Sequence, residues 1–149
     1  SIGVVPRLID MGVDPYLIAP TLILAVAQRL VAKICPGAGT PMSIDGSIKA
    51  MLDKQFADLP EEFRKEIPTS TEVLQASGTP DCPKGTRGRV AVLEMYKMDK
   101  DLEKVILSNP TGPEIWKVVR SKGMITMRED AIIKALNKSI PFEEVNTLL

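Results

Sequence analysis

The sequence contains no histidine. This absence excludes Ser–His and Cys–His nucleophilic catalysis, a histidine-ligated metal and a histidine phosphate sensor within these 149 residues. Cysteine is scarce as well, because Cys35 and Cys82 are the only two and cannot build a disulfide framework. Reduced thiols of a cytoplasmic protein are the expectation for this pair.

An excess of charge is also missing, because 19 Lys and Arg residues balance 19 Asp and Glu residues. A chain without net charge has no global field to attract a polyanion, so nucleic acid is not an expected partner. The longest apolar stretch, from Tyr16 to Ala27, is interrupted by Pro20 and Thr21. A bilayer-spanning helix needs about 20 apolar residues, and the N-terminus has no charged leader before an apolar run. We therefore expect neither a membrane span nor a signal peptide.

The phosphate-loop pattern G-x-x-x-x-G-K-[S/T] is absent. The segment from Gly37 to Thr40 is rich in glycine, but it has no lysine before a hydroxyl residue. A phosphate loop needs that lysine for the outer phosphates and the hydroxyl for magnesium. We expect a simple turn at this point and no ATP hydrolysis by this chain alone.

The first third of the chain is apolar. The 149 residues are 44% hydrophobic, enough for one domain or two small ones. Asp14 followed by Pro15 is a typical helix start. The apolar residues that follow on nearly every face predict a helix over residues 14–29 that is buried either in a large core or at a subunit interface. Alternation over residues 30–34 predicts a strand, which ends at a Gly/Pro-rich break.

The rest of the chain predicts short helices with a few strands. Ser43 is expected to cap a helix that runs to Phe56. The other expected elements are a short helix after residue 60, a strand over 71–76, a loop over 77–89, a strand over 90–95, and helices over 99–108 and 111–123 and from 126 and 141. Residues 111–114 and 126–129 both match the capping-box pattern. These elements predict an α+β fold that is mostly helical.

The two cysteines lie in similar segments. Cys35-Pro-Gly-Ala38 and Asp81-Cys82-Pro-Lys84 each resemble half of a zinc ribbon that keeps one thiolate. A structural zinc site needs four ligands, so Asp45 or Asp81 would have to complete it with oxygen. We expect two inert thiols rather than zinc, which are adjacent if the two loops pack together.

Two groups of polar residues are further candidates for binding. Lys84, Arg87 and Arg89 form a basic cluster on the expected loop. The cluster fits a phosphate, a lipid headgroup or an acidic partner surface, or it is a solvated loop whose arginines bond to helix ends. Gln28 and Arg29 end the expected apolar helix. Arg29 then either finds acceptors in the core, on a neighbouring subunit or on a nucleotide, or complements the helix dipole.

A series of short segments occurs in a fixed order along the chain, namely residues 6–15, 18–19, 27–31, 35–36, 87–94, 123–124, 126–130 and 142–145. This ordered series resembles the C-terminal part of the secretion ATPases, the motors of type II secretion and type IV pilus assembly. Gln28 and Arg29 match the Q-R-L element of this family, which lies in its motor core. The family commonly has two Cys-x-x-Cys pairs, whereas here Ala38 replaces one thiolate and Cys82 stands alone.

The resemblance implies a cytoplasmic homo-hexamer at the inner membrane face. Such a motor couples hydrolysis of ATP, with magnesium, to the assembly of pilin or pseudopilin through an inner-membrane platform protein. Contact with the membrane would pass through partners only. The resemblance also implies that the phosphate loop, the acidic boxes and the His box precede Ser1. The chain would then be an excerpt of a longer polypeptide that binds no cofactor with its own residues.

The same resemblance predicts three segments. Residues 1–34 are expected to be the distal end of a RecA-like motor domain, 35–95 a degenerate metal-lobe-like segment with short strands, and 96–149 a C-terminal helical subdomain. This portion would carry subunit and partner contacts rather than catalytic residues. The alternative is a stand-alone, non-enzymatic interaction module, which would fold cooperatively by itself in a reading frame that starts near Ser1.

Overall fold

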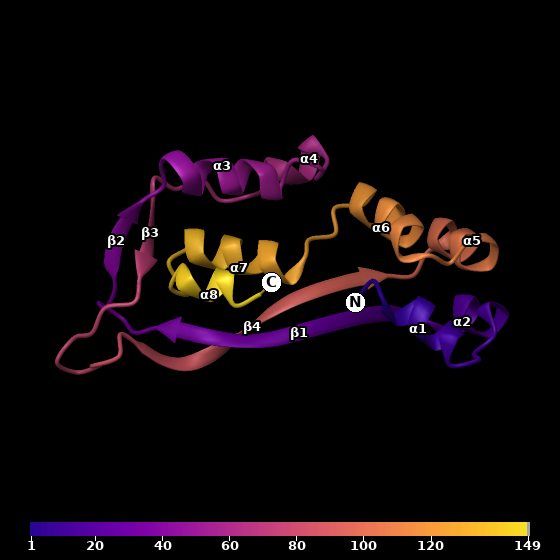
Figure 1. Ribbon diagram of the computed structural model, residues 1–149, viewed down its shortest axis with the longest axis horizontal. Coiled ribbons are helices and arrows are strands. Elements are labelled where there is room, and N and C mark those ends of the chain that lie inside the picture. Colours follow the sequence, from indigo (N-terminus) through magenta and orange to yellow (C-terminus); the bar gives the residue numbers. More distant parts are fainter. Residues whose placement is uncertain (149) are drawn as a thin grey trace. The chain divides into compact units, whose positions relative to one another are not determined.

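The computed structural model describes residues 1–148. Within them the chain has an α+β fold with eight helices and two two-stranded sheets. Contacts divide the chain into two compact units: unit 1 is Ser1–Ala27 with Glu94–Ile125, and unit 2 is Gln28–Leu93 with Thr126–Leu149. The boundary therefore falls within the strands β1 (Leu24–Ile34) and β4 (Thr86–Lys97), which pair with each other and run in opposite directions (Figure 1).

Unit 1 is built mainly from helices. It contains α1 (Val4–Asp10), α2 (Pro15–Thr21), α5 (Lys100–Ser108) and α6 (Gly112–Ser121), and α5 packs against both α2 and α6. The start of α2 confirms the predicted cap, because the Asp14 carboxylate accepts a hydrogen bond of 2.9 Å from the Tyr16 N–H. The core of this unit is made of apolar side chains, including Val5, Ile18, Ala25, Leu102, Ile106 and Ile115.

The predicted helix over residues 14–29 is wrong beyond Thr21. Leu22 is already extended, with φ −73° and ψ 120°, and β1 begins at Leu24. Along the strand Leu24 is exposed, Ala25 is buried and Val26 is exposed, which is the period of two that a strand produces. A short run with apolar residues at every position is ambiguous between helix and strand, and pairing with β4 decides it.

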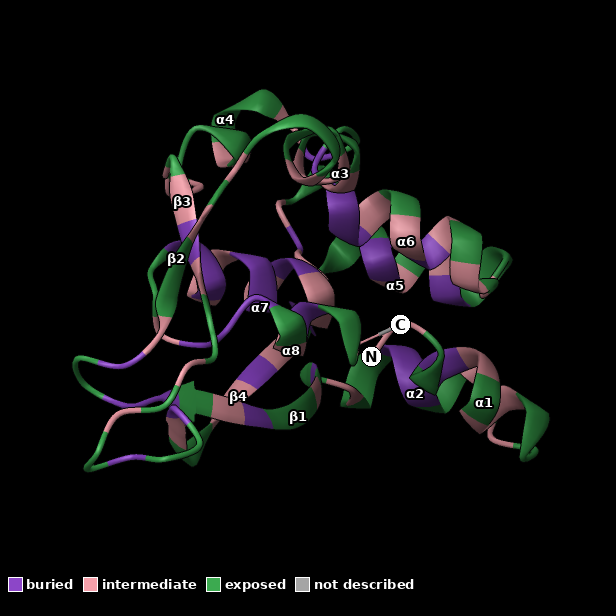
Figure 2. Ribbon diagram, turned by 60° about the vertical axis from the view of Figure 1, so that its left-hand side comes forward, coloured by how far each residue is buried: buried purple, intermediate pink, exposed green. Residues whose placement is uncertain are grey.

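Unit 2 combines a small sheet with four helices. Strands β2 (Thr40–Ser43) and β3 (Glu72–Gln75) pair antiparallel, with Thr40 opposite Gln75 and Ser43 opposite Glu72. The helices are α3 (Gly46–Gln55), α4 (Glu61–Arg64), α7 (Met127–Leu136) and α8 (Glu143–Asn146). Helix α7 packs against β3 and α8, and Figure 2 shows several buried positions along it.

Carboxylates of the C-terminal helices bond to strand and loop backbone within unit 2. Asp130 on α7 accepts from the Leu93 N–H at 2.7 Å, and Glu144 on α8 accepts from the Ala32 N–H at 3.1 Å. Glu143 accepts from the N–H that follows β3, that of Ala76, at 3.1 Å. These bonds give partners to backbone donors that the two-stranded sheets leave unpaired.

Several predicted boundaries are confirmed. Helix α4 follows Pro60, β3 falls inside residues 71–76, and α5 starts after Asp99. The predicted capping box at the start of α7 is present, because Thr126 and Glu129 exchange both hydrogen bonds.

Other predicted features are wrong. Ser43 belongs to β2, and Asp45 precedes α3 instead. Thr111 precedes α6, but its side chain makes no capping hydrogen bond. The predicted loop over 77–89 ends early, because β4 already begins at Thr86. None of the helices in residues 1–148 has the length and apolar character needed to cross a membrane.

Candidate functional site

Two tight turns bring the cysteines together in unit 2. The first turn follows β1, where the Ala38 N–H donates to the Cys35 carbonyl at 3.0 Å. The second precedes β4, where the Gly85 N–H donates to the Cys82 carbonyl at 2.9 Å. A third bond of 3.1 Å, from the Cys35 N–H to the Gly85 carbonyl, ties the two turns to each other. The two loops therefore lie next to each other, which is the condition under which the two cysteines were expected to be adjacent.

The expectation of reduced thiols is wrong. Cys35 and Cys82 form a disulfide with a Cα–Cα distance of 6.6 Å, which lies within the usual range for such a bond. Both residues are buried together with Ile34, Ala38 and partly buried Leu74. Among residues 1–148, no cluster of three or more potential protein ligands is arranged to hold a metal ion. The expectation of no zinc at this pair stays a prediction.

A small cavity of about 220 Å³ lies beside the disulfide. Its lining includes both cysteines together with Lys33, Asp81 and Arg87. The Arg87 guanidinium donates to the Asp81 carbonyl oxygen at 2.6 Å, which holds this part of the wall in place. Two cations and one carboxylate thus surround an opening to a disulfide, and the local charge is positive.

The predicted basic cluster is distributed differently from the expectation. Lys84 lies on the turn before β4, but Arg87 and Arg89 lie on the strand itself, and all three are exposed. Lys33 on β1 shares the cavity with Arg87, and sequence reasoning missed this residue. The only available signal was the alternation over residues 30–34, which predicts a strand but not the strand with which it pairs.

Gln28 and Arg29 lie on β1 rather than at a helix end, so the interpretation of Arg29 as a cation on a helix dipole is wrong. Both side chains are at least partly exposed. The disulfide cavity is lined by neither of them. A role for the pair in a motor core stays a prediction from the family resemblance.

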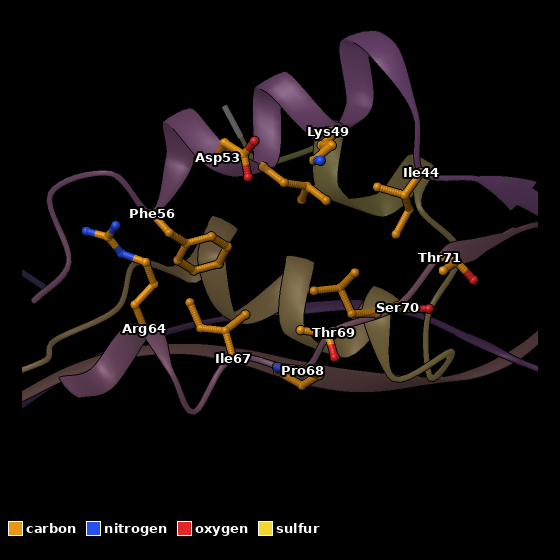
Figure 3. A pocket seen from close by; sticks show the side chains of 12 residues that line it. Ile44, Lys49, Asp53, Phe56, Arg64, Ile67, Pro68, Thr69, Ser70 and Thr71 are labelled. Atoms are coloured by element: carbon orange, nitrogen blue, oxygen red, sulfur yellow. The ribbon is translucent and has the colours of Figure 1, made fainter. Parts of the chain in front are cut away.

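A larger groove of about 610 Å³ lies between α3, the segment after α4 and α7 in unit 2. Figure 3 shows the apolar side chains of Ile44, Phe56 and Ile67 at this groove. Arg64 is held at its edge by hydrogen bonds to the carbonyl oxygens of Ala57 and Leu59, at 2.9 and 2.8 Å. The groove is mostly apolar and offers no pair of groups suited to catalysis.

A third cavity, of about 340 Å³, lies in unit 1 beside Tyr96, Asp99 and Lys122. Burial raises the pKa of Tyr96 to about 12, and its hydroxyl has no hydrogen-bond partner among residues 1–148. Lys122 donates a hydrogen bond to the Asp99 carboxylate and lowers the pKa of Asp99, while Asp99 raises the pKa of Lys122. These shifts follow from burial and an ion pair, so they do not indicate an acid–base site by themselves.

Unit 1 also exposes large apolar side chains. Ile23, Leu24 and Val26 are 73%, 50% and 51% exposed, and Tyr16 and Leu17 on α2 are 71% and 63% exposed. We call Ile23, Leu24 and Val26 the β1 apolar segment. Contiguous exposed apolar surface usually marks a contact with another protein surface. These residues were expected in a helix buried in a core or at a subunit interface, whereas the structure places Leu24 and Val26 on an exposed part of a strand.

Comparison with known proteins gives matches that cover nearly the whole chain. The model of a family described as type II/IV secretion system protein matches residues 1–147. The type IV pilus assembly ATPase PilB of Thermus thermophilus is 30% identical over 142 residues, which cover 95% of this chain and 15% of that relative. The type II secretion system ATPase E of Vibrio cholerae is 31% identical over 146 residues, covering 97% and 27% respectively. The chain thus spans less than a third of the length of these relatives.

Proposed function

Because this chain belongs to the type II/IV secretion system protein family, we propose that it is the C-terminal portion of an ATPase that powers type IV pilus assembly or type II secretion. The observation that carries the proposal is the match over residues 1–147 within much longer relatives named as ATPases of these two systems. The portion carries subunit and partner contacts, and the chemistry belongs to other parts of the full-length protein.

The residues of this chain do not fit ATP and magnesium. The sequence has no phosphate loop. Residues 1–148 also gather no cluster of carboxylates that could hold a metal ion. In the proposal, ATP and magnesium therefore bind to other residues of the full-length protein, and no step of hydrolysis is assigned to a side chain of this chain.

The exposed β1 apolar segment supports a role in contacts. Ile23, Leu24 and Val26 expose half or more of their surface to water, while Ala25 between them is buried in the core of unit 1. Burying an apolar side chain of this size is worth about 1.5–3 kcal/mol. In the proposed cytoplasmic homo-hexamer, this segment packs against the rest of the motor domain, at the distal end of a RecA-like fold. Other surfaces of this portion serve contacts with sister subunits and with an inner-membrane platform protein.

The experiment uses the full-length protein with Leu24→Asp and Val26→Asp combined. Size-exclusion chromatography with light scattering measures its mass with and without ATP, and phosphate release measures its activity. We expect at least about a tenfold loss of ATPase activity, since about 1.4 kcal/mol of lost contact energy already gives a factor of ten. We also expect loss of the hexamer, because a motor domain without this packing no longer holds its subunit contacts in place. Met11→Asp is the control, because Met11 is 73% exposed but lies outside the β1 apolar segment.

Two results would contradict the proposal. One is a wild-type full-length protein that stays monomeric with and without nucleotide. The other is a reading frame that begins at or near Ser1 without an upstream phosphate loop, which would favour a stand-alone interaction module. If the Leu24→Asp/Val26→Asp variant still forms an active hexamer, the β1 apolar segment has no role in contacts. The proposal that the chain is part of a secretion or pilus ATPase would not be affected by that result.

A further inference from the structure

The cysteine turns are held by backbone hydrogen bonds that do not depend on the disulfide. Each cysteine carbonyl accepts from the third residue after it, Ala38 or Gly85, and the Cys35 N–H donates to the Gly85 carbonyl. The Cys82 backbone also exchanges a pair of bonds with Thr79, both 3.0 Å long. Because these bonds join backbone atoms only, we expect the two thiols to remain close enough to re-form the sulfur–sulfur bond after it opens.

The wall of the cavity beside the disulfide carries more positive than negative side chains. Lys33 and Arg87 line its wall, and Asp81 is the one carboxylate there. Neither cation is part of an ion pair with a carboxylate in the described part of the chain, since Arg87 bonds to a backbone carbonyl. Positive charge beside sulfur also favours the thiolate form, which is both the attacking and the leaving species in thiol–disulfide exchange.

We propose that Cys35 and Cys82 form a thiol–disulfide exchange site for a small anionic thiol of the glutathione type. A thiolate from the small molecule attacks one cysteine sulfur, the sulfur–sulfur bond breaks, and the other cysteine leaves as a thiolate. A second thiol attacks the mixed disulfide and releases the small-molecule disulfide together with the remaining cysteine thiolate. Two electrons and two protons pass from two small thiols to the protein, and the reverse sequence closes the bond with the small-molecule disulfide as oxidant.

Opening this bond removes a covalent cross-link from unit 2, and we expect the helices and strands of the unit to remain folded. The disulfide joins residues separated by 47 positions, so its loss frees a long loop that contains β2, α3, α4 and β3. Closing a loop of this length constrains the unfolded chain strongly. We expect the melting temperature to fall by about 10 °C on reduction, with helix and strand content unchanged. The inference concerns unit 2 alone and does not rest on the proposed motor function.

The first experiment measures the redox state of the full-length protein in buffers with graded ratios of reduced to oxidised glutathione. Acid quenching, alkylation and peptide mapping by mass spectrometry follow Cys35 and Cys82 specifically. We expect an oxidised pair after aerobic purification, full opening in reducing buffer without denaturant, and closure when the ratio is reversed. Free thiols after aerobic purification, opening only in denaturant, or loss of the circular dichroism signal on reduction would each overturn the proposal.

The second experiment tests the role of charge at the cavity. The rate of opening is measured with glutathione and with 2-mercaptoethanol, which carries no charge besides its thiolate, for the wild type and for Lys33→Gln. Removing one charge from the cavity wall should slow the reaction with glutathione about threefold and the reaction with 2-mercaptoethanol less, because both reagents attack as thiolates but only glutathione carries further negative charge. Lys104→Gln is the matched control, because Lys104 is an exposed lysine of unit 1. Equal slowing with both thiols would mean that the cavity does not respond to the additional negative charge of glutathione, and would overturn the charge selection.

Discussion

One side chain, that of Asp99, stabilises the start of α5 through two distinct interactions. The Asp99 carboxylate accepts hydrogen bonds of 3.0 Å from the N–H groups of Asp101 and Leu102, and also binds the Lys122 ammonium. The first interaction caps the helix and the second is a partly exposed ion pair. Capping is worth about 1 kcal/mol, whereas an exposed ion pair is worth about 0–1 kcal/mol. The cap is therefore expected to contribute more to the free energy of unfolding than the ion pair does.

Substitution of Asp99 separates these contributions. Asp99→Asn keeps an N-cap acceptor and should change the free energy of unfolding by less than about 0.5 kcal/mol at pH 7. Asp99→Ala loses the cap as well and should cost about 1 kcal/mol. Urea denaturation measures both. Equal losses in the two variants would show that the ion pair with Lys122, and not the cap, stabilises this helix start.

The same pair predicts a pH dependence. The hydrogen bond from Lys122 holds the pKa of Asp99 below its ordinary value of 3.8. A lowered pKa contributes stability that is present above pH 3.8 and is lost as the pH falls through the folded-state pKa. The difference in unfolding free energy between wild type and Asp99→Asn should therefore shrink as the pH is lowered below 3.8. A difference that stays constant down to about pH 2 would contradict this assignment.

At the scale of elements, helices α6 and α7 both have threonine at the N-cap position and follow one sequence pattern, but their caps differ. At α7 the Thr126 hydroxyl accepts from the Glu129 N–H at 3.2 Å, and the Glu129 carboxylate accepts from the Thr126 N–H at 2.8 Å. At α6 the Thr111 side chain makes no such bond. Proline in the first turn of α6 fixes the backbone there and removes a donor, so this helix start depends less on its cap.

This difference predicts unequal costs for the same substitution. Thr126→Ala should lower the free energy of unfolding by about 1 kcal/mol, because it leaves the Glu129 N–H without its partner. Thr111→Ala should cost less than about 0.5 kcal/mol. Chemical denaturation followed by circular dichroism gives both values. An α6 substitution that costs as much as the α7 substitution would contradict the difference between the two caps.

The turn before β4 requires glycine at position 85 for two reasons. Gly85 has φ +71°, and a Cβ atom there would lie 2.5 Å from the Ser77 carbonyl oxygen. Gly88 has a similar φ of +75°, but a Cβ atom on this residue would meet no other atom within 4 Å. The pair therefore separates backbone strain from steric conflict.

Alanine at these two positions should give different results. Gly88→Ala is expected to cost about 1 kcal/mol from the left-handed backbone alone. Gly85→Ala should cost at least about 1 kcal/mol more, because the turn must open to accept the methyl group. It should also lower the fraction of protein that carries the Cys35–Cys82 bond, measured by alkylation. Equal stability and equal disulfide content in the two variants would contradict the close approach of Ser77.

At the scale of the whole molecule, the chain folds into two compact units. Its two units each have buried apolar side chains, and the β1 apolar segment remains exposed. The chain spans 15% of one relative named above and 27% of the other. We therefore expect that activity requires the rest of the full-length protein.

This expectation leads to a direct measurement. Residues 1–149 purified alone should release phosphate from ATP at the rate of a blank without protein, whereas the full-length protein should turn it over. The physical reason is that no residue of the chain provides the lysine and hydroxyl of a phosphate loop. Turnover that survives repurification of the isolated chain would remove the basis of the proposed function.

Local interactions explain what was predictable. Asp14, Thr126 and Pro60 mark helix starts through bonds or restrictions that act within four residues, and the structure confirms all three. The cap predicted at Ser43 is wrong, because a strand pairs this residue with Glu72, which lies far along the chain. The candidate site was only partly predictable: the cysteines and the basic residues could be named, but neither the disulfide nor the position of Lys33 could be derived.

The sequence by itself determined several helix starts, among them those of α2, α4, α5 and α7. It also determined turns with glycine and proline, the lack of a nucleotide-binding loop and the resemblance to a motor family. Tertiary structure alone decided that residues 24–29 form a strand, that Cys35 meets Cys82, and that Lys33 shares a cavity with Arg87. The reason is the range of the interactions. Caps and turns are stabilised by neighbours along the chain, whereas strand pairing and cysteine bonding join residues tens of positions apart, and a period-two or apolar pattern does not specify the partner.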